Sequence, residues 1–160
     1  MNPIAWLAQL RVEDIGVDAE LVAEILRQAR TTRGERGHNV GGWRSDEHFT
    51  TWPTAQRTLH AIADVVVPSY AKTPTLRAWA VVHERGSYHD WHAHTGIAWR
   101  CSGVLYLTTG GAATLFRSPS ASARVVPKKG TLLTFPSGVE HATEPHDELE
   151  PRITVAFNAS

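Results

Sequence analysis

The chain has 160 residues, a length typical of one domain with a substantial hydrophobic core. Its 16 Lys and Arg residues balance its 16 Asp and Glu residues, so no net positive charge favours nucleic acid or an anionic membrane surface. A single Cys excludes an intramolecular disulfide, and no apolar stretch approaches the roughly 20 residues of a membrane span. We expect a cytoplasmic protein of one domain, 1–160, whose partners include neither nucleic acid nor a membrane.

The N-terminal region, residues 1–73, is predicted to be mainly helical. Asp18 can cap a helix over 18–29, where apolar residues recur on one side. Pro53 can begin a second helix over 53–67, which keeps the helical period until the next proline. Both predicted helices are amphipathic, so each needs a partner surface on which to bury its apolar side.

The C-terminal region, residues 74–160, contains short β-rich runs separated by Gly, Pro and Ser. The predicted strands are 76–83, 89–94, 103–108, 113–116, 124–126, 131–135 and 152–158. Since no helical period interrupts them, we expect a mainly β, α+β fold: a jelly-roll core of antiparallel, cupin-like type with the two helices packed on one face. The Ser- and Ala-rich segment 118–123 and the glycine-rich segment 31–42 are predicted to be loops.

Nine histidines are present, and His92 and His94 are spaced to converge on one metal ion. Residues two apart on a strand point to the same face, with Cα atoms about 6.5 Å apart. His141 is the best candidate for a third ligand, because a predicted strand and a tight turn lead into it. Two histidines on one strand and a distant third would leave open positions on the ion, as catalysis at a metal requires.

The other histidines are assigned different roles. His83 and His89 are expected behind the metal site or on the surface, with His89 as an alternative ligand. Structural or solvent roles are expected for His38, His48, His60 and His146. A lone His-x-His motif is common in proteins without a metal, so the prediction depends on its combination with His141 and the string of strands.

Arg152 begins the last predicted strand. The apolar residues of that strand share one face, so Arg152 shares the other face with Thr154 and Ala156. These small neighbours leave space beside the guanidinium group, and a planar set of donors beside a cavity suits a carboxylate. The alternative is an arginine on an edge strand with its side chain in solvent.

Five blocks of the sequence resemble, in the same order, the small bacterial and phage group of Fe(II)- and 2-oxoglutarate-dependent oxygenases. The blocks are GGWRS at 41–45, HAH at 92–94, SGVLYL at 102–107, GTLLTFPS at 130–137 with His141, and PRITVAFN at 151–158. The resemblance implies a double-stranded β-helix with iron at its mouth, the distal histidine at His141 and the arginine that anchors 2-oxoglutarate at Arg152. Tyr106 is then a candidate hydrogen-bond partner of that cosubstrate.

The sequence departs from the family at one ligand. Most members bind iron through two histidines and a carboxylate, whereas this chain has His94 where the carboxylate would be. We expect a three-histidine iron site of His92, His94 and His141. Two alternatives stay open: His94 lies near the iron without binding it, or His94 is itself the first ligand of a site without a third protein ligand, as in the 2-oxoglutarate halogenases.

The expected function is hydroxylation of a small molecule, an amino acid or a peptide, with Fe(II) and 2-oxoglutarate supplying the oxidative chemistry. Trp43 and Trp52 either line the substrate entrance or fix the loop that carries them, and Trp79, Trp91 and Trp99 are expected to pack. The sequence specifies neither the substrate nor the oligomeric state.

Two other functions compete. A cupin-type metal enzyme or metal-binding module fits the spacing of 86–94 and 130–141, but it lacks the expected Glu after the histidine pair and leaves Arg152 unexplained. A scaffold that binds partners without metal is the third alternative.

Overall fold

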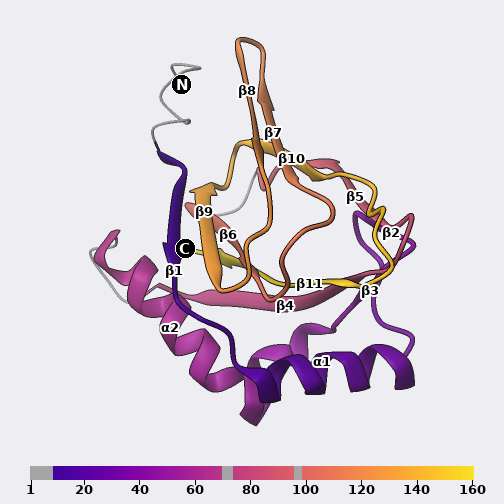
Figure 1. Ribbon diagram of the computed structural model, residues 1–160. Helices are drawn as coiled ribbons and strands as arrows, with labels where there is room; N and C mark the ends of the chain where they lie inside the picture. The colour runs from indigo at the N-terminus through magenta and orange to yellow at the C-terminus, as the bar shows by residue number, and fades with distance from the viewer. Residues whose placement is uncertain (1–8, 70–73, 96–98) are drawn as a thin grey trace.

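The computed structural model describes residues 9–69, 74–95 and 99–160, which form two antiparallel sheets and two α-helices (Figure 1). The six-stranded sheet has the order β1-β9-β6-β11-β4-β3, and the five-stranded sheet has the order β2-β5-β10-β7-β8. The strands are β1 Arg11–Asp14, β2 Asn39–Val40, β3 Trp43–Arg44, β4 Leu76–His83, β5 Tyr88–His92, β6 Cys101–Tyr106, β7 Thr114–Ser118, β8 Ala121–Val125, β9 Thr131–Pro136, β10 Glu140–Thr143 and β11 Arg152–Ala159. The helices are α1 Ala19–Thr31 and α2 Gln56–Val66, with 3-10 turns η2 Glu47–Thr51, η3 Pro53–Ala55 and η4 Val67–Ser69. The prediction of a mainly β fold with antiparallel sheets and two helices is confirmed.

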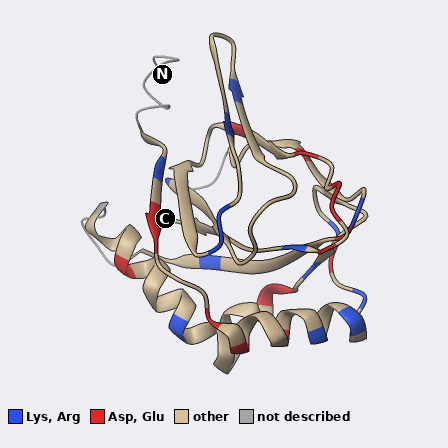
Figure 2. Cartoon of the chain, in the orientation of Figure 1, with Lys and Arg blue, Asp and Glu red and all other residues tan. Residues whose placement is uncertain are grey.

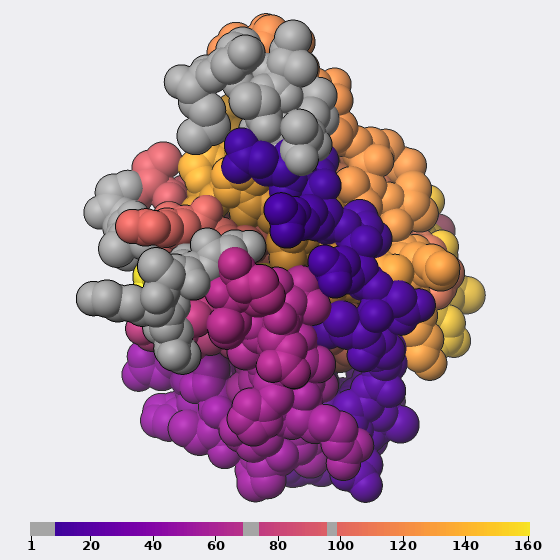
Figure 3. All heavy atoms as spheres, turned by 90° about the vertical axis from the view of Figure 1, so that its left-hand side faces the viewer, coloured from indigo at the N-terminus to yellow at the C-terminus, as the bar shows by residue number. Residues whose placement is uncertain are grey.

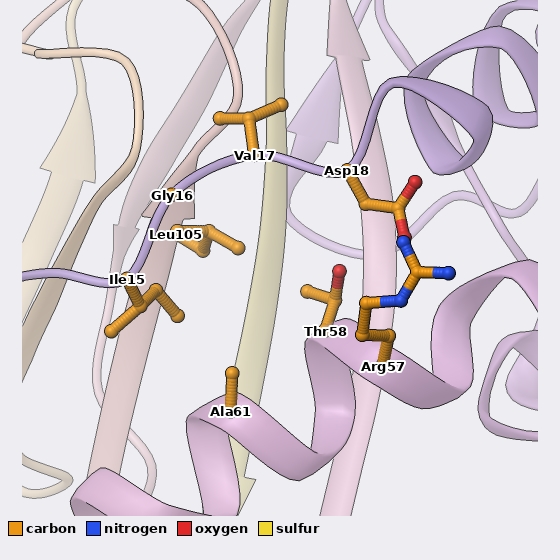
Figure 4. Close-up of a pocket in the computed structure, with 8 residues that line it drawn as sticks. All are labelled: Ile15, Gly16, Val17, Asp18, Arg57, Thr58, Ala61 and Leu105. Atoms are coloured by element: carbon orange, nitrogen blue, oxygen red, sulfur yellow. The ribbon is translucent and has the colours of Figure 1, made fainter.

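The two helices begin where the sequence indicates. The Asp18 side chain accepts a hydrogen bond from the Glu20 N–H at 3.0 Å and so caps α1. Pro53 opens a 3-10 turn that leads directly into α2. Asp18 also forms an ion pair with Arg57 of α2, at 3.0 Å, beside a cavity of about 220 Å³, and Figure 4 shows the two charged groups pointing toward one another. One carboxylate therefore both starts α1 and ties it to α2.

Two hydrophobic cores hold the layers together. Both helices lie on one side of the six-stranded sheet (Figure 1), and Leu21, Ile25 and Ile62 are fully buried against it. The second core, which includes Phe116 and Phe135, lies between the two sheets. Burying such a side chain contributes about 1.5 to 3 kcal/mol to stability. The fold is therefore held by apolar packing that does not depend on a bound ion.

Gly103 of β6 allows strands and side chains to approach closely. A Cβ atom at this position would lie 2.7 Å from the carbonyl oxygen of Leu133 and would collide with the ring of Phe157. Only glycine avoids both contacts without a shift of the neighbouring strand.

Three strands in the N-terminal region were not predicted. β2 and β3 have two residues each, too few to show an alternating pattern, and each lies at the edge of a sheet. β2 falls in the segment 31–42 that was expected to be a loop, and β3 falls in the block GGWRS at 41–45. β1 pairs with β9, and Figure 3 shows this early segment (indigo) running beside α2 (magenta). The prediction that 1–73 is mainly helical is therefore incomplete.

The prediction of a loop over 118–123 is wrong. β7 and β8 form a hairpin, in which Ser118 pairs with Ala121, so that only Pro119 and Ser120 form the turn. The small residues of β8 alternate between half-buried and exposed positions. Small side chains lower the strand propensity of the segment, but pairing with β7 overrides it.

Acidic and basic residues are interspersed along the elements rather than gathered by sign (Figure 2), in agreement with the balanced composition. Among the described residues, no helix is long and apolar enough to cross a membrane.

Candidate metal centre

The structure brings together the three histidines that the sequence indicates. His92 on β5 and His141 on β10 are directly opposite each other in the five-stranded sheet. With His94, they form a group whose candidate ligand nitrogens all lie within 4.8 Å of one another. Ligands at right angles on one ion, at about 2.1 Å each, are about 3 Å apart, so small rotations of the imidazole rings suffice to bind an ion.

Two of the rings are held in the tautomer that a metal ligand needs. His92 Nδ1 lies 2.8 Å from the carbonyl oxygen of Asp90, and His141 Nδ1 lies 2.9 Å from that of Val139. A carbonyl oxygen only accepts, so Nδ1 carries the proton in each ring and donates it. The lone pair of each neutral imidazole is therefore on Nε2, free to bind a metal.

His94 is positioned by a different segment of the chain. β5 ends at His92, so the predicted strand over 89–94 is too long and the argument from a shared strand face does not apply. Instead, the His94 backbone N–H donates to the Ser137 carbonyl oxygen at 2.9 Å, which ties this segment to the turn before β10. The His94 ring lies 5.3 Å from the His92 ring and 5.2 Å from the His141 ring, centroid to centroid.

Burial keeps these imidazoles neutral. It lowers the pKa of His141 to about 3 and that of His94 to about 4, with the neighbouring His92 as the next cause in each case. Burial also lowers the pKa of His92, although the Asp90 carbonyl partly offsets this effect. At neutral pH all three side chains therefore present lone pairs rather than positive charges.

Further histidines surround this group. His38, expected in a structural or solvent role, instead stacks on His92 with ring centroids 4.5 Å apart and planes 12° from parallel. His89 lies 4.9 Å from His92 between ring centroids, and burial lowers its pKa to about 2. His89 therefore lies next to the group of His92, His94 and His141 but does not belong to it. His48 and His60 are exposed, as expected.

Arg152 is buried between the sheets, only 2% exposed, so the expected placement on the inner face of β11 is confirmed and the solvent alternative is wrong. Its Nη1 donates to His83 Nδ1 at 3.5 Å and its Nη2 to Thr114 Oγ1 at 3.4 Å. Its Nε has no hydrogen-bond partner, and no described carboxylate forms an ion pair with it. Burial lowers its pKa. A buried cation without an anion is costly, which indicates that an anionic ligand belongs here.

Tyr106 and Thr114 complete the surroundings of Arg152. The Tyr106 ring lies under the guanidinium, with 5.5 Å between its centroid and Arg152 Cζ, and its hydroxyl is 2.7 Å from Thr114 Oγ1. A narrow cavity of about 40 Å³, room for about three water-sized atoms, is lined by the three histidines, by His89 and by Thr114. Sequence reasoning missed Thr114, because a lone strand threonine carries no signal of its own.

A wider cavity of about 320 Å³ also borders His92 and His94, and it shares Trp79 and His89 with the narrow cavity. Trp79 and Trp99, expected only to pack, line the wider cavity. Trp43 and Trp52 do not line this cavity. Both pack against the helical core and also line a separate cavity of about 370 Å³, so the choice between an entrance role and a loop-fixing role stays a prediction. Trp91 stacks under Arg117, whose Cζ is 4.0 Å from a ring centroid of the indole.

The solved structures that match this chain include members of the 2-oxoglutarate/Fe(II) oxygenase family. A prolyl-4-hydroxylase from Pseudomonas putida matches with a TM-score of 0.71 and 17% identity, over 94% of this chain and 91% of that chain. An oxidoreductase of the 2OG-Fe(II) oxygenase family from Burkholderia pseudomallei matches with a TM-score of 0.70 and 14% identity, over 98% and 88%. HygX from Streptomyces hygroscopicus, with nickel and 2-oxoglutarate bound, matches with a TM-score of 0.70 and 10% identity, over 94% and 82%.

No protein-family model matches the sequence, and no curated protein matches it. The similarity to the solved structures is therefore one of fold, and at this level the resemblance drawn from the five sequence blocks is confirmed.

Proposed function

We propose that the protein is an Fe(II)- and 2-oxoglutarate-dependent oxygenase that hydroxylates its substrate. In this proposal the two sheets form the double-stranded β-helix of these enzymes, and the chain is one domain, with a helical region at residues 1–73 and a jelly-roll region at residues 74–160. The observation that carries the proposal is the pairing of two features in one inter-sheet space: three neutral histidines that converge, and a buried arginine without an acidic partner.

The donor set suits Fe(II). Neutral imidazole binds iron well, and three protein ligands leave positions for a cosubstrate and for O2. His92 and His141 would bind through Nε2, because their Nδ1 atoms are engaged with backbone carbonyls. His94 would take the position of the family's carboxylate, which makes the protein's share of the site neutral rather than singly negative.

The surroundings of Arg152 suit the distal carboxylate of 2-oxoglutarate. That carboxylate has three heavy atoms, which is about what the narrow cavity accommodates. Thr114 lines the cavity directly, and Arg152 and Tyr106 both contact its hydroxyl. We assign the cosubstrate contact to Thr114 and Arg152, with Tyr106 holding the Thr114 hydroxyl in place.

When bound, iron and 2-oxoglutarate supply the oxidising power, with conversion of 2-oxoglutarate to succinate and CO2 coupled to insertion of oxygen into a substrate C–H bond. The residues of the chain bind, orient and exclude water. Phe135 walls the site, with its ring centroid 4.7 Å from that of His141, and His38 covers His92. His83 accepts from Arg152 through Nδ1 and donates through Nε2 to Asn39 Oδ1 at 2.7 Å, so the arginine is fixed in orientation.

The test is an anaerobic titration of the Fe(II)-loaded protein with 2-oxoglutarate, followed by the weak visible absorption of the iron chelate. We expect a saturable band with one equivalent of cosubstrate. Iron binding without that band would indicate a cupin-type metal protein, and absence of iron binding would indicate a scaffold that uses no metal.

A further inference from the structure

The 320 Å³ cavity beside His92 and His94 has an unusual set of polar groups. Apart from histidines, its polar side chains are Arg44, Arg77, Trp79, Trp99 and Asn158, and none of the described acidic residues lines it. Arginine and tryptophan side chains offer only donors. The wall therefore presents positive charge and N–H groups toward the space next to the proposed iron.

Arg44 lies half-buried in this wall and is held in place. Its Cζ is 4.6 Å from a ring centroid of Trp79, a cation–π contact, and its Nη1 lies so close to Gly37 that a Cβ there would approach to 2.9 Å. Its Nε is buried without a hydrogen-bond partner. Burial lowers the pKa of Arg44, and the nearby charge of Glu35 partly offsets this effect. Arg44 and Glu35 nevertheless form no ion pair.

Strands β4 and β11 add further donors. Arg77 and Trp79 are two residues apart on β4, so both point to the same face, and Arg77 is directly opposite Asn158 on β11. The Trp79 Nε1 is buried without a partner. Asn158 Oδ1 accepts from Ser102 Oγ at 2.7 Å, which leaves the Asn158 amide N–H groups to donate. Arg77 is exposed at the rim, and no described acidic side chain is paired with it.

We propose that this cavity binds the organic substrate of the oxygenase through an anionic group, a carboxylate or a phosphate, held by Arg44 and the Trp79 indole N–H with Arg77 at the rim. The identification of the ligand as the substrate rests on the proposed function. The anion site itself rests only on the residues that line the cavity. A volume of about 320 Å³ is at the lower end for ligand pockets. The substrate is therefore a small acidic molecule.

The binding test uses metal-free protein, so that it does not depend on iron or on 2-oxoglutarate. Benzoate and its neutral counterpart benzamide are titrated into ¹⁵N-labelled protein, and the indole N–H signals are followed by NMR, with Trp79 assigned through Trp79→Phe. We expect benzoate to shift the Trp79 signal with saturation in the millimolar range, and benzamide to bind at least tenfold more weakly. Phenyl phosphate in a third arm distinguishes the two anions: tighter binding than benzoate selects phosphate, and weaker binding selects carboxylate.

Variants locate the site. Arg44→Gln should weaken benzoate binding at least tenfold, because it removes a partly buried charge partner, and Arg77→Gln should weaken it about two- to threefold, as expected for a rim charge. Arg44→Lys is the fallback if the glutamine variant does not fold, and it should lose part of the affinity because lysine lacks the planar fork. Arg30→Gln, an exposed arginine of α1, is the matched control and should bind as the wild type does.

Three results would overturn the inference: no benzoate binding, equal binding of benzamide, or an unchanged affinity in Arg44→Gln. A loss in Arg152→Gln without a loss in Arg44→Gln would place the anion in the inner cavity instead. Failure of the iron and 2-oxoglutarate titration, with benzoate binding intact, would reject the proposed function and leave the anion site standing.

Discussion

Replacing Arg152 by methionine should separate cosubstrate binding from folding. The side chain is 2% exposed and has no ion-pair partner among the described residues. The wild-type protein therefore carries the cost of a buried, unpaired charge whenever no ligand is bound, and methionine of similar length removes that cost. We expect the metal-free Arg152→Met variant to be at least as stable as the wild type.

The same substitution should weaken 2-oxoglutarate binding strongly. Loss of one partner of a buried, hydrogen-bonded charge pair costs about 2 to 5 kcal/mol, which corresponds to about 30-fold to several-thousand-fold in the dissociation constant. Arg152→Lys should retain part of the affinity, because it keeps the charge but not the two-pronged contact. Iron binding should be unchanged in both variants, since neither removes a proposed ligand.

The assay combines two measurements on each variant. Urea denaturation of the metal-free protein gives the free energy of unfolding, and anaerobic titration of the Fe(II) protein gives the 2-oxoglutarate dissociation constant. Arg124→Met, which removes an exposed arginine paired with Glu144, is the matched control for loss of a charge. Equal dissociation constants in wild type and Arg152→Met would refute the assignment of Arg152 as the anchor.

Other residues give equally direct tests. His92→Ala and His141→Ala should each abolish bound iron in a folded protein, measured by metal analysis and circular dichroism; full iron occupancy would remove that residue from the site. His94→Ala should weaken iron binding and His94→Asp should preserve it, since carboxylate oxygen also binds Fe(II); unchanged affinity in His94→Ala would favour a two-histidine site. Gly103→Ala should lower the free energy of unfolding by about 1 to 3 kcal/mol in urea denaturation, because the added Cβ collides with neighbouring strands; an unchanged midpoint would contradict the close packing. Burial lowers the pKa of His83 to about 3, whereas an unfolded histidine titrates near 6.5, so the unfolded chain takes up the proton first as pH falls. Protonation of the unfolded chain therefore lowers the wild-type free energy of unfolding, by up to about 1.4 kcal/mol per pH unit from His83 alone, as the pH falls from about 6.5 to 3. In metal-free His83→Gln this contribution should be absent. The same dependence of the free energy of unfolding on pH in both proteins would show that His83 titrates as in solvent.

Patterns that extend over many residues predicted the fold well. The strand over 76–83 and the cap at Asp18 agree with β4 and the start of α1, because each has a long periodic run or a specific local hydrogen bond. β2 and β3 could not be predicted, since two residues carry no period and their conformation depends on pairing with β5 and β4. The β7–β8 hairpin was missed because pairing, not composition, makes small residues extended there.

Residue type and motif predicted the candidate metal ligands, whereas contacts made by residues outside any motif were missed. His92, His94 and His141 converge as expected, although His94 reaches the group from a loop rather than from the strand. His38 stacks on His92 across more than fifty residues of sequence, a contact that no local pattern encodes. The same holds for Thr114, which meets Arg152 only because β7 and β11 belong to facing sheets.

Iron binding by the three histidines, beside a cosubstrate held by Arg152, can be observed in a crystal structure of protein crystallised anaerobically with Fe(II) and 2-oxoglutarate, with anomalous diffraction collected at the iron edge. We expect one anomalous peak within about 2.2 Å of nitrogens of His92, His94 and His141, and a carboxylate beside Arg152 and Thr114. A peak bound by His38 or His89 instead, or a cosubstrate carboxylate away from Arg152, would contradict this expectation.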